Sequence, residues 1–417
     1  MAAVGFNLIG REMHILFLTD NFPPEVNAPA SRTFEHCCEW VTAGHRVTVI
    51  TCVPNFPKGR VFDGYSNRLW QSEEMAGIRV IRVWSYITAN EGFVKRILDY
   101  QSFMLMAILA ALFVRRIDVV VGTSPQFFTV CAAFVVSRLK RIPFVFELRD
   151  LWPESIKAVG AMQDSTALRA LERLEMFLYR KAARIVSVTH SFKKTLVARG
   201  VDGDKVTVVT NGVDMKRFKP MLKDIDLVNK LGLEGKFVAG YVGTHGLAHH
   251  LETLLDAAEM VRGLPDGAAF HFILLGDGAR KLELKEDAVR RGLDNITFVD
   301  SVPKDQVSRY WSLLDVSIIH LKKSELFTTV IPSKLFECIG MGLPVLHGVA
   351  GESAEIVRDE GIGIVFEPEN TSELVEHLQF LRRDCSAYEG YREQCMEAAK
   401  KYDRSLMAKR MLDVLTR

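Results

Sequence analysis

The residues with the clearest chemical potential lie in the segment IPSKLFECIGMGLPV of the second half. Proline favours the first position of a helix, so Pro332 predicts a helix that carries Ser333, Lys334 and Glu337. The positive end of such a helix and the Lys334 amine attract an anion, and the Glu337 carboxylate can accept hydrogen bonds from a ribose diol. The alternative is an ion pair between Glu337 and Lys334 at i, i+3 spacing on a solvated face.

A glycine-containing turn precedes this segment in the same half, within GYVGTHGLAHH. It follows an apolar run, so the backbone of Gly243, Thr244, His245 and Gly246 suits the oxygens of a phosphate group. Glycine spacing of this kind is a weak signal by itself. The turn therefore predicts a phosphate site only in combination with its neighbours.

Two further features lie close to that turn in the sequence. His249 and His250 can add protons and positive charge near a diphosphate, although a pair of surface histidines explains them equally well. No carboxylate or cysteine accompanies them at ligand spacing, so no metal site is predicted. Gly276 and Asp277 lie in LLGDG, where glycine allows close backbone approach to a ligand, and where turn formation alone is also sufficient.

Polar residues in the first half follow an apolar run in FVFELRDLWPES. Asp150 or Glu154 can orient a hydroxyl group, and Trp152 can stack on a sugar ring. Alternatively, Arg149 and Asp150 pair with each other. We favour a ligand role, because residues at the carboxyl end of a strand face the ligand in open α/β sheets.

The proline-rich loop NFPPEVNAPASR contains Asn27 and Arg32 and lies between a predicted strand and a predicted helix. Backbone N–H groups and the positive end of the helix can face a substrate at such a junction. A rigid connector fits the loop equally well. Asn27 and Arg32 are therefore candidates for the acceptor side of a site.

The elements that must position these residues alternate between apolar strands and amphipathic helices in both halves of the chain. The predicted strands are 14–19, 45–52, 78–84, 118–123, 143–147 and 184–189, followed by 237–243, 270–275, 295–298, 316–319, 344–346 and 363–366. This pattern predicts an α/β protein with two facing, doubly wound, Rossmann-like domains and a cleft between them. The predicted boundaries are 1–218 and 219–390, with a helical tail over 391–417 that can cross to the first domain.

Composition sets limits on the class of protein. The chain has 417 residues, a formal net charge of +2 and seven cysteines, none of them in a Cys-x-x-Cys pair. The length predicts two domains, and the mild charge does not indicate a nucleic-acid partner. Scattered cysteines predict reduced thiols. The N-terminus does not resemble a signal peptide, so a cytoplasmic location is expected, and residues 1–12 are interpreted as a possible extension outside the fold.

The most apolar predicted helix is FMLMAILAALFV, residues 103–114. It has Lys95 and Arg96 before it and Arg115 and Arg116 after it. The run is shorter than the roughly 20 apolar residues that span a bilayer, which favours a buried core helix. The alternative is an interfacial helix whose apolar face meets lipid while its basic flanks meet anionic headgroups.

Taken together, these motifs resemble the family 4 retaining glycosyltransferases of the GT-B type. The likeness extends over nearly the whole chain from Met13. It rests on HILFLTDNFPPE, GHRVTVIT, DVVVGTSP, VFELRDLWPES, SVTHSF, KVTVVTNGVDMKRFKP, YVGTHG, LLGDG, IPSKLFECIGMGLPV and GESAEIV. Within the family, the chain looks most like bacterial transferases of surface-polysaccharide assembly, including those that handle N-acetylfucosamine-type sugars.

The resemblance implies a UDP-sugar donor bound by the second domain and an acceptor bound by the first. It implies transfer with retention of configuration, without a metal or other cofactor, with Asp150, Lys334 and Glu337 as the catalytic candidates. The implied acceptor is a polyprenyl-diphosphate-linked saccharide at the inner face of the cytoplasmic membrane, in O-antigen, capsule or exopolysaccharide synthesis. The protein would then be peripherally bound to that membrane.

The chain departs from the family pattern at several positions. Paired glycines of the first loop are replaced by Ala28, Pro29 and Ala30, and the earlier of two glutamates separated by seven residues is replaced by Thr329. The Arg and Lys that neutralise the donor diphosphate in relatives would fall near Thr244 and His249. We therefore assign that role to His245, His249 and Lys334. Two other functions are compatible with the same features: a UDP-sugar epimerase, and a non-catalytic nucleotide-sugar-binding subunit of an assembly complex.

Overall fold

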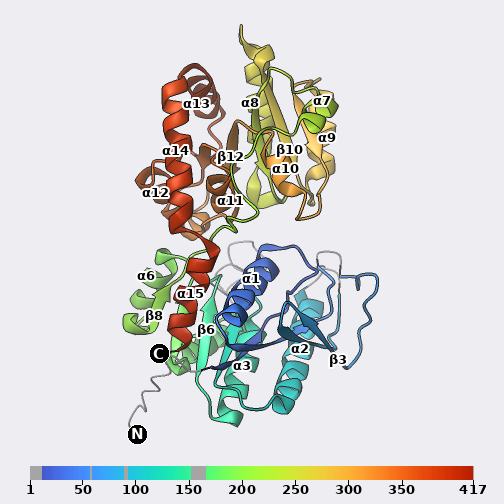
Figure 1. Ribbon diagram of the computed structural model, residues 1–417, viewed down its shortest axis with the longest axis vertical. Helices are drawn as coiled ribbons and strands as arrows, with labels where there is room; N and C mark the ends of the chain where they lie inside the picture. The colour runs from blue at the N-terminus through green and yellow to red at the C-terminus, as the bar shows by residue number, and fades with distance from the viewer. Residues whose placement is uncertain (1–11, 57–58, 89–92, 152–165, 417) are drawn as a thin grey trace. The chain divides into compact units, whose positions relative to one another are not determined.

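The chain forms two compact units in the computed structural model, which describes residues 12–56, 59–88, 93–151 and 166–416 (Figure 1). The first unit comprises Met1–Thr210 and Arg404–Arg417, and the second comprises Asn211–Asp403. The expected boundary after residue 218 lies later than this division. A parallel bridge between Val213 and Asp403 explains the difference, because it ties the chain just after Thr210 to the second unit.

The C-terminal segment expected as one tail over 391–417 is divided between the two units. Helix α14 (Cys385–Lys401) belongs to the second unit, and helix α15 (Arg404–Leu415) belongs to the first. In the first unit, the Trp40 indole N–H donates a hydrogen bond of 2.9 Å to the carbonyl oxygen of Ala408. The last helix is therefore part of the core of the first unit.

The first unit is built on an eight-stranded sheet in the order β3-β4-β2-β1-β5-β6-β7-β8. Six strands confirm the sequence predictions: β1 (His14–Leu18), β2 (Arg46–Cys52), β4 (Ile78–Val83), β5 (Val119–Thr123), β6 (Phe144–Leu148) and β7 (Arg184–Ser187). These six strands run parallel to their neighbours in this set. The carboxyl ends of the strands therefore lie along one edge, where the candidate acceptor residues follow them.

Two strands were missed by the sequence analysis. Strand β8 (Val206–Val208) is short, and β3 (Trp70–Met75) has polar residues in alternation. Strand β3 pairs antiparallel with β4, so this sheet is not purely parallel as predicted. The two strands are joined by Ala76 and Gly77, both with positive φ, which is the backbone conformation of a two-residue hairpin turn.

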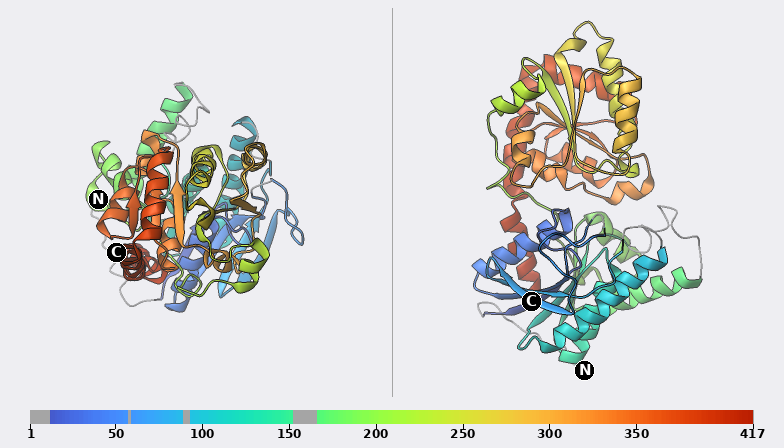
Figure 2. Two further views of the ribbon diagram at one scale, coloured as in Figure 1. Left: turned by 90° about the horizontal axis from the view of Figure 1, so that it is seen from above. Right: turned by 90° about the vertical axis from the view of Figure 1, so that its right-hand side faces the viewer.

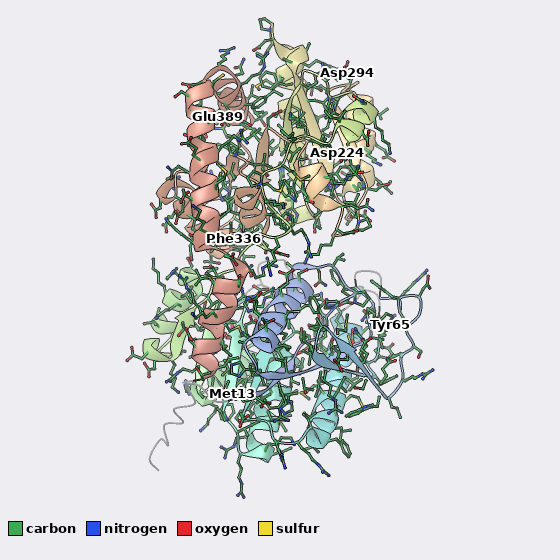
Figure 3. The ribbon with its side chains drawn as sticks, in the orientation of Figure 1. Met13, Tyr65, Asp224, Asp294, Phe336 and Glu389 are labelled. Atoms are coloured by element: carbon green, nitrogen blue, oxygen red, sulfur yellow. The ribbon has the colours of Figure 1, made fainter. Side chains whose placement is uncertain are left out.

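Both faces of the first sheet are covered by helices, because side chains alternate between its faces. On β1, Leu16 and Leu18 enter the core formed with α2 (Phe93–Phe113), α3 (Phe127–Lys140) and α5 (Thr166–Lys181). Ile15 and Phe17 enter the opposite core, formed with α1 (Ala28–Thr42) and α15. Helix α6 (His190–Ala198) completes the unit. Figure 3 labels Met13, which is buried in the second of these cores.

Helix α2 is longer than the sequence analysis expected. Phe103, Ala107 and Ala110 are buried against the sheet. By length and composition alone, its Lys95–Phe113 portion would suffice to cross a membrane, a test that core helices of soluble proteins also pass. One face of the helix is buried, as a core helix requires, and its other face is exposed.

The second unit contains a six-stranded parallel sheet in the order β11-β10-β9-β12-β13-β14. All six strands confirm predictions: β9 (Phe237–Val242), β10 (Phe270–Leu275), β11 (Ile296–Val299), β12 (Val316–His320), β13 (Val345–Gly348) and β14 (Gly363–Val365). The longer helices are α7 (Ile225–Leu231), α8 (Glu252–Arg262), α9 (Lys281–Arg290), α11 (Lys334–Gly340), α12 (Glu352–Asp359) and α13 (Thr371–Arg383), besides α14. Helices lie on both faces of the sheet (Figure 2). Both units are therefore doubly wound, as predicted.

Candidate functional site

Two glycine turns meet at the carboxyl edge of the second sheet, directly after β9 and β10. Each of Gly243 and Gly276 has a φ near +148°, at +148° and +147° respectively. A methyl group on Gly276 would collide with the carbonyl oxygen of Gly243, and one on Gly278 would collide with the backbone of His245. The two turns therefore interlock at a distance that only glycine permits.

In the first turn, some backbone N–H groups donate hydrogen bonds within the fold and others do not. The Gly243 N–H donates to Leu275, and the His245 N–H donates to Asp277, in bonds of 2.9 Å each. Within the described residues, the N–H groups of Thr244 and Gly246 donate to no acceptor. The expected phosphate cradle of four amides is therefore reduced to these two.

Lys334 brings its amine to the same turn. The amine nitrogen lies 3.6 Å from the centre of the Tyr241 ring and would lie 2.8 Å from a methyl group on Gly243. It is buried, and it has no hydrogen-bond partner in the part of the chain that the structure describes. The expected alternative, a pair with Glu337, is therefore not formed. Burial lowers the pKa of Lys334 to about 7.

His245 and His249 add two imidazoles to this position. The His245 side chain is fully buried, and neither of its ring nitrogens has a partner among the described residues. The same holds for Nδ1 of His249. Burial, with the charges of Lys281 and Lys334 nearby, lowers the pKa of His245 to about 4. Burial, with the charge of Lys334 nearby, lowers the pKa of His249 to about 3. Both rings are therefore neutral near pH 7.

We call this set the nitrogen cluster: the Lys334 amine and the ring nitrogens of His245 and His249. Buried polar atoms are almost always hydrogen-bonded in folded proteins, so several unpaired ones in one place call for an explanation. An anion with several acceptor oxygens would satisfy them together. The arrangement therefore offers an anion neutral imidazoles, one amine and two peptide N–H groups as hydrogen-bond donors.

The other candidates of the second unit lie on neighbouring segments. Ser333 immediately precedes α11, and its hydroxyl accepts a hydrogen bond of 3.1 Å from the Asn211 amide. Pro332 thus lies before this cap and not in the first turn as predicted. Thr329 uses its hydroxyl locally, donating to the carbonyl oxygen of Leu326 at 3.0 Å. Glu337 lies in the first turn of α11 and is partly exposed.

Asp277 lies beyond β10, in the second of the two glycine turns. Its side chain is exposed and accepts a bond of 2.8 Å from the N–H of Gly278. Its carbonyl oxygen is the acceptor for the N–H of His245. Asp277 therefore stabilises both glycine turns through hydrogen bonds. From the sequence, turn formation was one of two alternatives for this segment.

In the first unit, the Arg32 side chain forms its interactions within the interior of that unit. Its guanidinium forms a buried ion pair of 3.0 Å with Glu147 and donates to the carbonyl oxygens of Val209 and Thr210. Asn27 caps α1 by accepting a bond of 2.9 Å from the N–H of Ala30. The structural alternative for this loop, a rigid connector, accounts for both residues.

Arg149 and Asp150 follow β6, as expected. Their backbone N–H groups share the Ser124 hydroxyl as acceptor, at 2.9 and 3.3 Å. Burial lowers the pKa of Arg149 to about 10, partly offset by the nearby Glu147 carboxylate. Trp152 and Glu154 lie outside the described residues.

Tyr241 is the functional candidate that the sequence analysis missed. It is a buried strand residue whose hydroxyl donates to the carbonyl oxygen of Thr244 at 2.8 Å. An aromatic residue within an apolar strand indicates a core position, so its type and place gave no signal of a site. Among the described residues, no group of three or more His, Cys, Asp or Glu side chains is arranged to hold a metal ion.

Comparison with known proteins agrees with this architecture. Residues 27–212 match the profile of a glycosyl transferase 4-like domain, and residues 236–384 match that of glycosyl transferases group 1. A protein of Escherichia coli (strain K12), named as a colanic acid biosynthesis glycosyl transferase, is 26% identical over 88% of this chain and 91% of its own. A GDP-mannose-dependent alpha-mannosyltransferase of Mycobacterium tuberculosis is 23% identical over 85% of this chain and 83% of its own.

Solved structures share the fold. The Anabaena protein HepE, in complex with UDP-glucose, superimposes with a TM-score of 0.70 at 17% identity, covering 97% of this chain and 100% of HepE. WaaG, a glycosyltransferase involved in lipopolysaccharide biosynthesis, gives a TM-score of 0.66 at 15% identity, covering 96% and 99% of the two chains.

The chain has two doubly wound units, and the second unit has glycine turns at its strand ends. This architecture is that of the GT-B glycosyltransferases. Within that class, the two matched domains identify the family. The chain belongs to the family 4-like glycosyltransferases that combine a 4-like domain with a group 1 domain.

Proposed function

We propose that this protein is a retaining glycosyltransferase of bacterial surface-polysaccharide synthesis that uses a UDP-sugar donor. The donor sugar we propose is an N-acetylated deoxyhexosamine, and the acceptor is a polyprenyl-diphosphate-linked saccharide. O-antigen, capsule or exopolysaccharide is the product class. A relative named for colanic acid biosynthesis supports the product class, and the UDP-glucose complex of HepE supports a UDP-sugar donor. The relative named for GDP-mannose-dependent transfer supports a nucleotide-sugar donor without distinguishing UDP from GDP.

The observation that carries the proposal is the nitrogen cluster. The donor diphosphate places its oxygens against the Lys334 amine, the imidazoles of His245 and His249, and the N–H groups of Thr244 and Gly246. The Glu337 carboxylate accepts hydrogen bonds from the ribose hydroxyls. The rest of the donor position is lined by Ser333, Thr329, Gly276 and Asp277. Charge-assisted hydrogen bonds in a dry site are strong enough to hold a dianion.

The reaction we propose is front-face transfer. A bond forms between the acceptor oxygen and the anomeric carbon while the bond from that carbon to the diphosphate breaks. The hydroxyl proton passes to a departing diphosphate oxygen, whose charge Lys334 and the two amides stabilise. Asp150 orients the acceptor hydroxyl, with Arg149, Trp152 and Glu154 on the acceptor side. No metal or further cofactor takes part in the proposed step.

We also propose that the protein binds the inner face of the cytoplasmic membrane through α2. Leu98, Leu105, Leu109 and Leu112 are each roughly half exposed and recur at helical spacing along one face. The exposed Lys95, Arg96, Arg115 and Arg116 flank this stripe. An apolar helical face between basic ends matches the chemistry of an anionic bilayer surface.

The experiment that tests the proposal measures nucleotide release. Purified protein is incubated with a panel of UDP-sugars, with GDP-mannose as the comparison donor, and with a membrane extract that contains lipid-linked saccharides. We expect UDP release that depends on the acceptor and occurs with an acetamido sugar. Conversion of donor without acceptor would indicate an epimerase, and UDP binding without turnover of any donor would indicate a non-catalytic subunit.

A further inference from the structure

Tyr241 contacts every component of the nitrogen cluster from one buried position. Its ring face lies 3.6 Å from the Lys334 amine. Its ring centre lies 5.9 Å from the ring centres of both His245 and His249. Its hydroxyl donates to the carbonyl oxygen of Thr244. The side chain itself is fully buried among the strand and helix residues of the second unit.

The hydroxyl of Tyr241 fixes one peptide group of the first glycine turn. The carbonyl oxygen of Thr244 accepts from Tyr241 at 2.8 Å, and the N–H of His245, in the same peptide group, donates to Asp277 at 2.9 Å. This peptide plane is held at both ends. Because this peptide plane is fixed, the orientations of the neighbouring Thr244 and Gly246 N–H groups are restricted as well.

The ring of Tyr241 has a second role, toward the buried amine. An ammonium group that lacks hydrogen bonds is costly to bury, and the negative face of an aromatic ring offsets part of that cost. The other titratable or charged groups that act on Lys334 and the two imidazoles are Glu337, Cys338, Asp277, Lys281, Lys285 and His320. None of them forms a hydrogen bond with the Lys334 amine, so the ring is its direct contact.

We propose that Tyr241 is a positioning residue for the donor diphosphate, which holds the Lys334 amine with its ring and orients the glycine turn with its hydroxyl. The inference rests on the proposed function, because it assigns a role within that donor site. It separates two contributions that can be removed one at a time. Substitution by Phe removes only the hydroxyl, and substitution by Leu removes the ring as well.

The test measures UDP binding by calorimetry between pH 6 and 9 for wild type, Tyr241→Phe and Tyr241→Leu. Tyr241→Phe is expected to weaken binding about threefold to tenfold at every pH, as one neutral hydrogen bond predicts. Tyr241→Leu is expected to weaken it further and to move the loss of affinity to lower pH, because an amine without the ring loses its proton more readily. Ratios to wild type at each pH remove the titration of UDP itself.

Tyr179 supplies the matched control. It is a fully buried tyrosine of the first unit, and its hydroxyl donates to Glu175 at 2.7 Å. Tyr179→Phe and Tyr179→Leu should lower stability without changing the pH profile of UDP binding. Where Tyr241→Leu does not fold, Tyr241→Met keeps more bulk and still lacks a ring.

Two outcomes overturn the inference in different ways. Binding of UDP by wild type with no change in affinity or pH profile for the ring-free variant would reject the role of Tyr241 and leave the donor site intact. Absence of UDP binding by wild type, with folded protein, would reject the donor site and the role of Tyr241 together. The result that supports the inference is a pH shift in the ring-free variant alone, together with a Tyr241→Phe variant that binds UDP more weakly than wild type by the same factor at every pH. A Tyr241→Phe variant with wild-type affinity would reject the role of the hydroxyl.

Discussion

At the scale of single residues, the second unit holds a group that its own fold leaves unsatisfied. The Lys334 amine is buried without a hydrogen bond in the described part of the chain, and its pKa falls to about 7. Such a group opposes folding and favours the binding of an anion. Functional sites commonly combine these two effects, because the binding geometry is built in advance of the ligand.

The first prediction concerns Lys334→Met. Removing the amine should raise the melting temperature of the unliganded protein near pH 7 and weaken UDP binding by about tenfold to a hundredfold, as loss of a charged hydrogen-bond donor predicts. Lys230→Met, at an exposed position of α7, is the control and should change neither quantity. A variant that is less stable and binds UDP normally would contradict this view of the amine.

The pH dependence of this effect has a definite sign. The pKa of Lys334 is lowered in the folded state, so the unfolded chain binds more protons between about pH 7 and the ordinary lysine value. The stability of wild type relative to Lys334→Met should therefore rise as the pH increases through that window. Thermal unfolding of both proteins at pH 7 and pH 9 measures the difference.

At the scale of elements, the glycine turns after β9 and β10 act as one unit. Gly276 lies against the carbonyl oxygen of Gly243, and Gly278 lies against His245. A side chain at either position would separate the turns and displace the nitrogen cluster. This close approach links the two strand ends to the geometry of the proposed donor site.

We predict that Gly276→Ala weakens both folding and donor binding. The added methyl group collides with backbone and not with a flexible side chain, so we expect a loss of about 3 kcal/mol or more, at the upper end for single substitutions. Gly235→Ala is the control, because Gly235 also has a positive φ but open space around it. It should cost about 1 kcal/mol and leave UDP binding unchanged. Denaturant unfolding and calorimetry measure both effects, and equal losses for the two variants would argue against interlocked turns.

The stripe on α2 gives a prediction at the same scale. The double substitution Leu105→Glu and Leu109→Glu should abolish flotation with vesicles that contain anionic lipid, because it places charge on the face proposed to enter the bilayer interface. Leu282→Glu, at an exposed leucine of α9 in the second unit, should float like wild type. Wild-type protein that stays in the soluble fraction would count against membrane association.

Most elements were predictable from the sequence, and the exceptions have physical reasons. Apolar runs such as 237–243 and 270–275 predicted the parallel strands correctly, because a strand covered on both faces is continuously apolar. Strand β3, at the sheet edge, has the sequence WQSEEM. Its exposed polar residues lack the apolar run by which the other strands were predicted. The start of α2 was missed because Lys95 and Asp99 interrupt its apolar pattern.

The candidate site was only partly accessible to sequence reasoning. The sequence made Lys334 a candidate because it lies near the start of a predicted helix, and His249 a candidate because it follows a glycine turn. The commitment of the His245 N–H to Asp277, and the position of Tyr241 beneath the amine, depend on side chains and turns meeting across the sheet edge. Residue order along the chain carries little information on such contacts.

At the scale of the whole molecule, the chain leaves the first unit after Thr210 and returns to it at Arg404. Helix α15 contributes Met407 and Met411 to the core on one face of the first sheet. Arg404 forms an ion pair with Glu35 of α1. The stability of the first unit therefore depends on the last residues of the sequence, while the proposed donor site lies wholly in the second.

Removal of residues 404–417 should therefore separate the two units in a thermal scan. We expect the transition of the first unit to fall or disappear, because large core side chains are each worth about 2–5 kcal/mol. UDP should still raise the transition of the second unit. Lys409→Ala, on the exposed side of α15, is the control. Loss of the UDP response in a chain whose second unit stays folded would contradict this division.

The most direct test of the central claim asks whether the nitrogen cluster binds a diphosphate. Nuclear magnetic resonance of the imidazoles of His245 and His249 and of the Lys334 amine is followed while UDP, or uridine without phosphate, is added. We expect UDP to shift all three signals and to raise the pKa of Lys334, and uridine to leave them in place. Binding of UDP with no change at these three residues would contradict it.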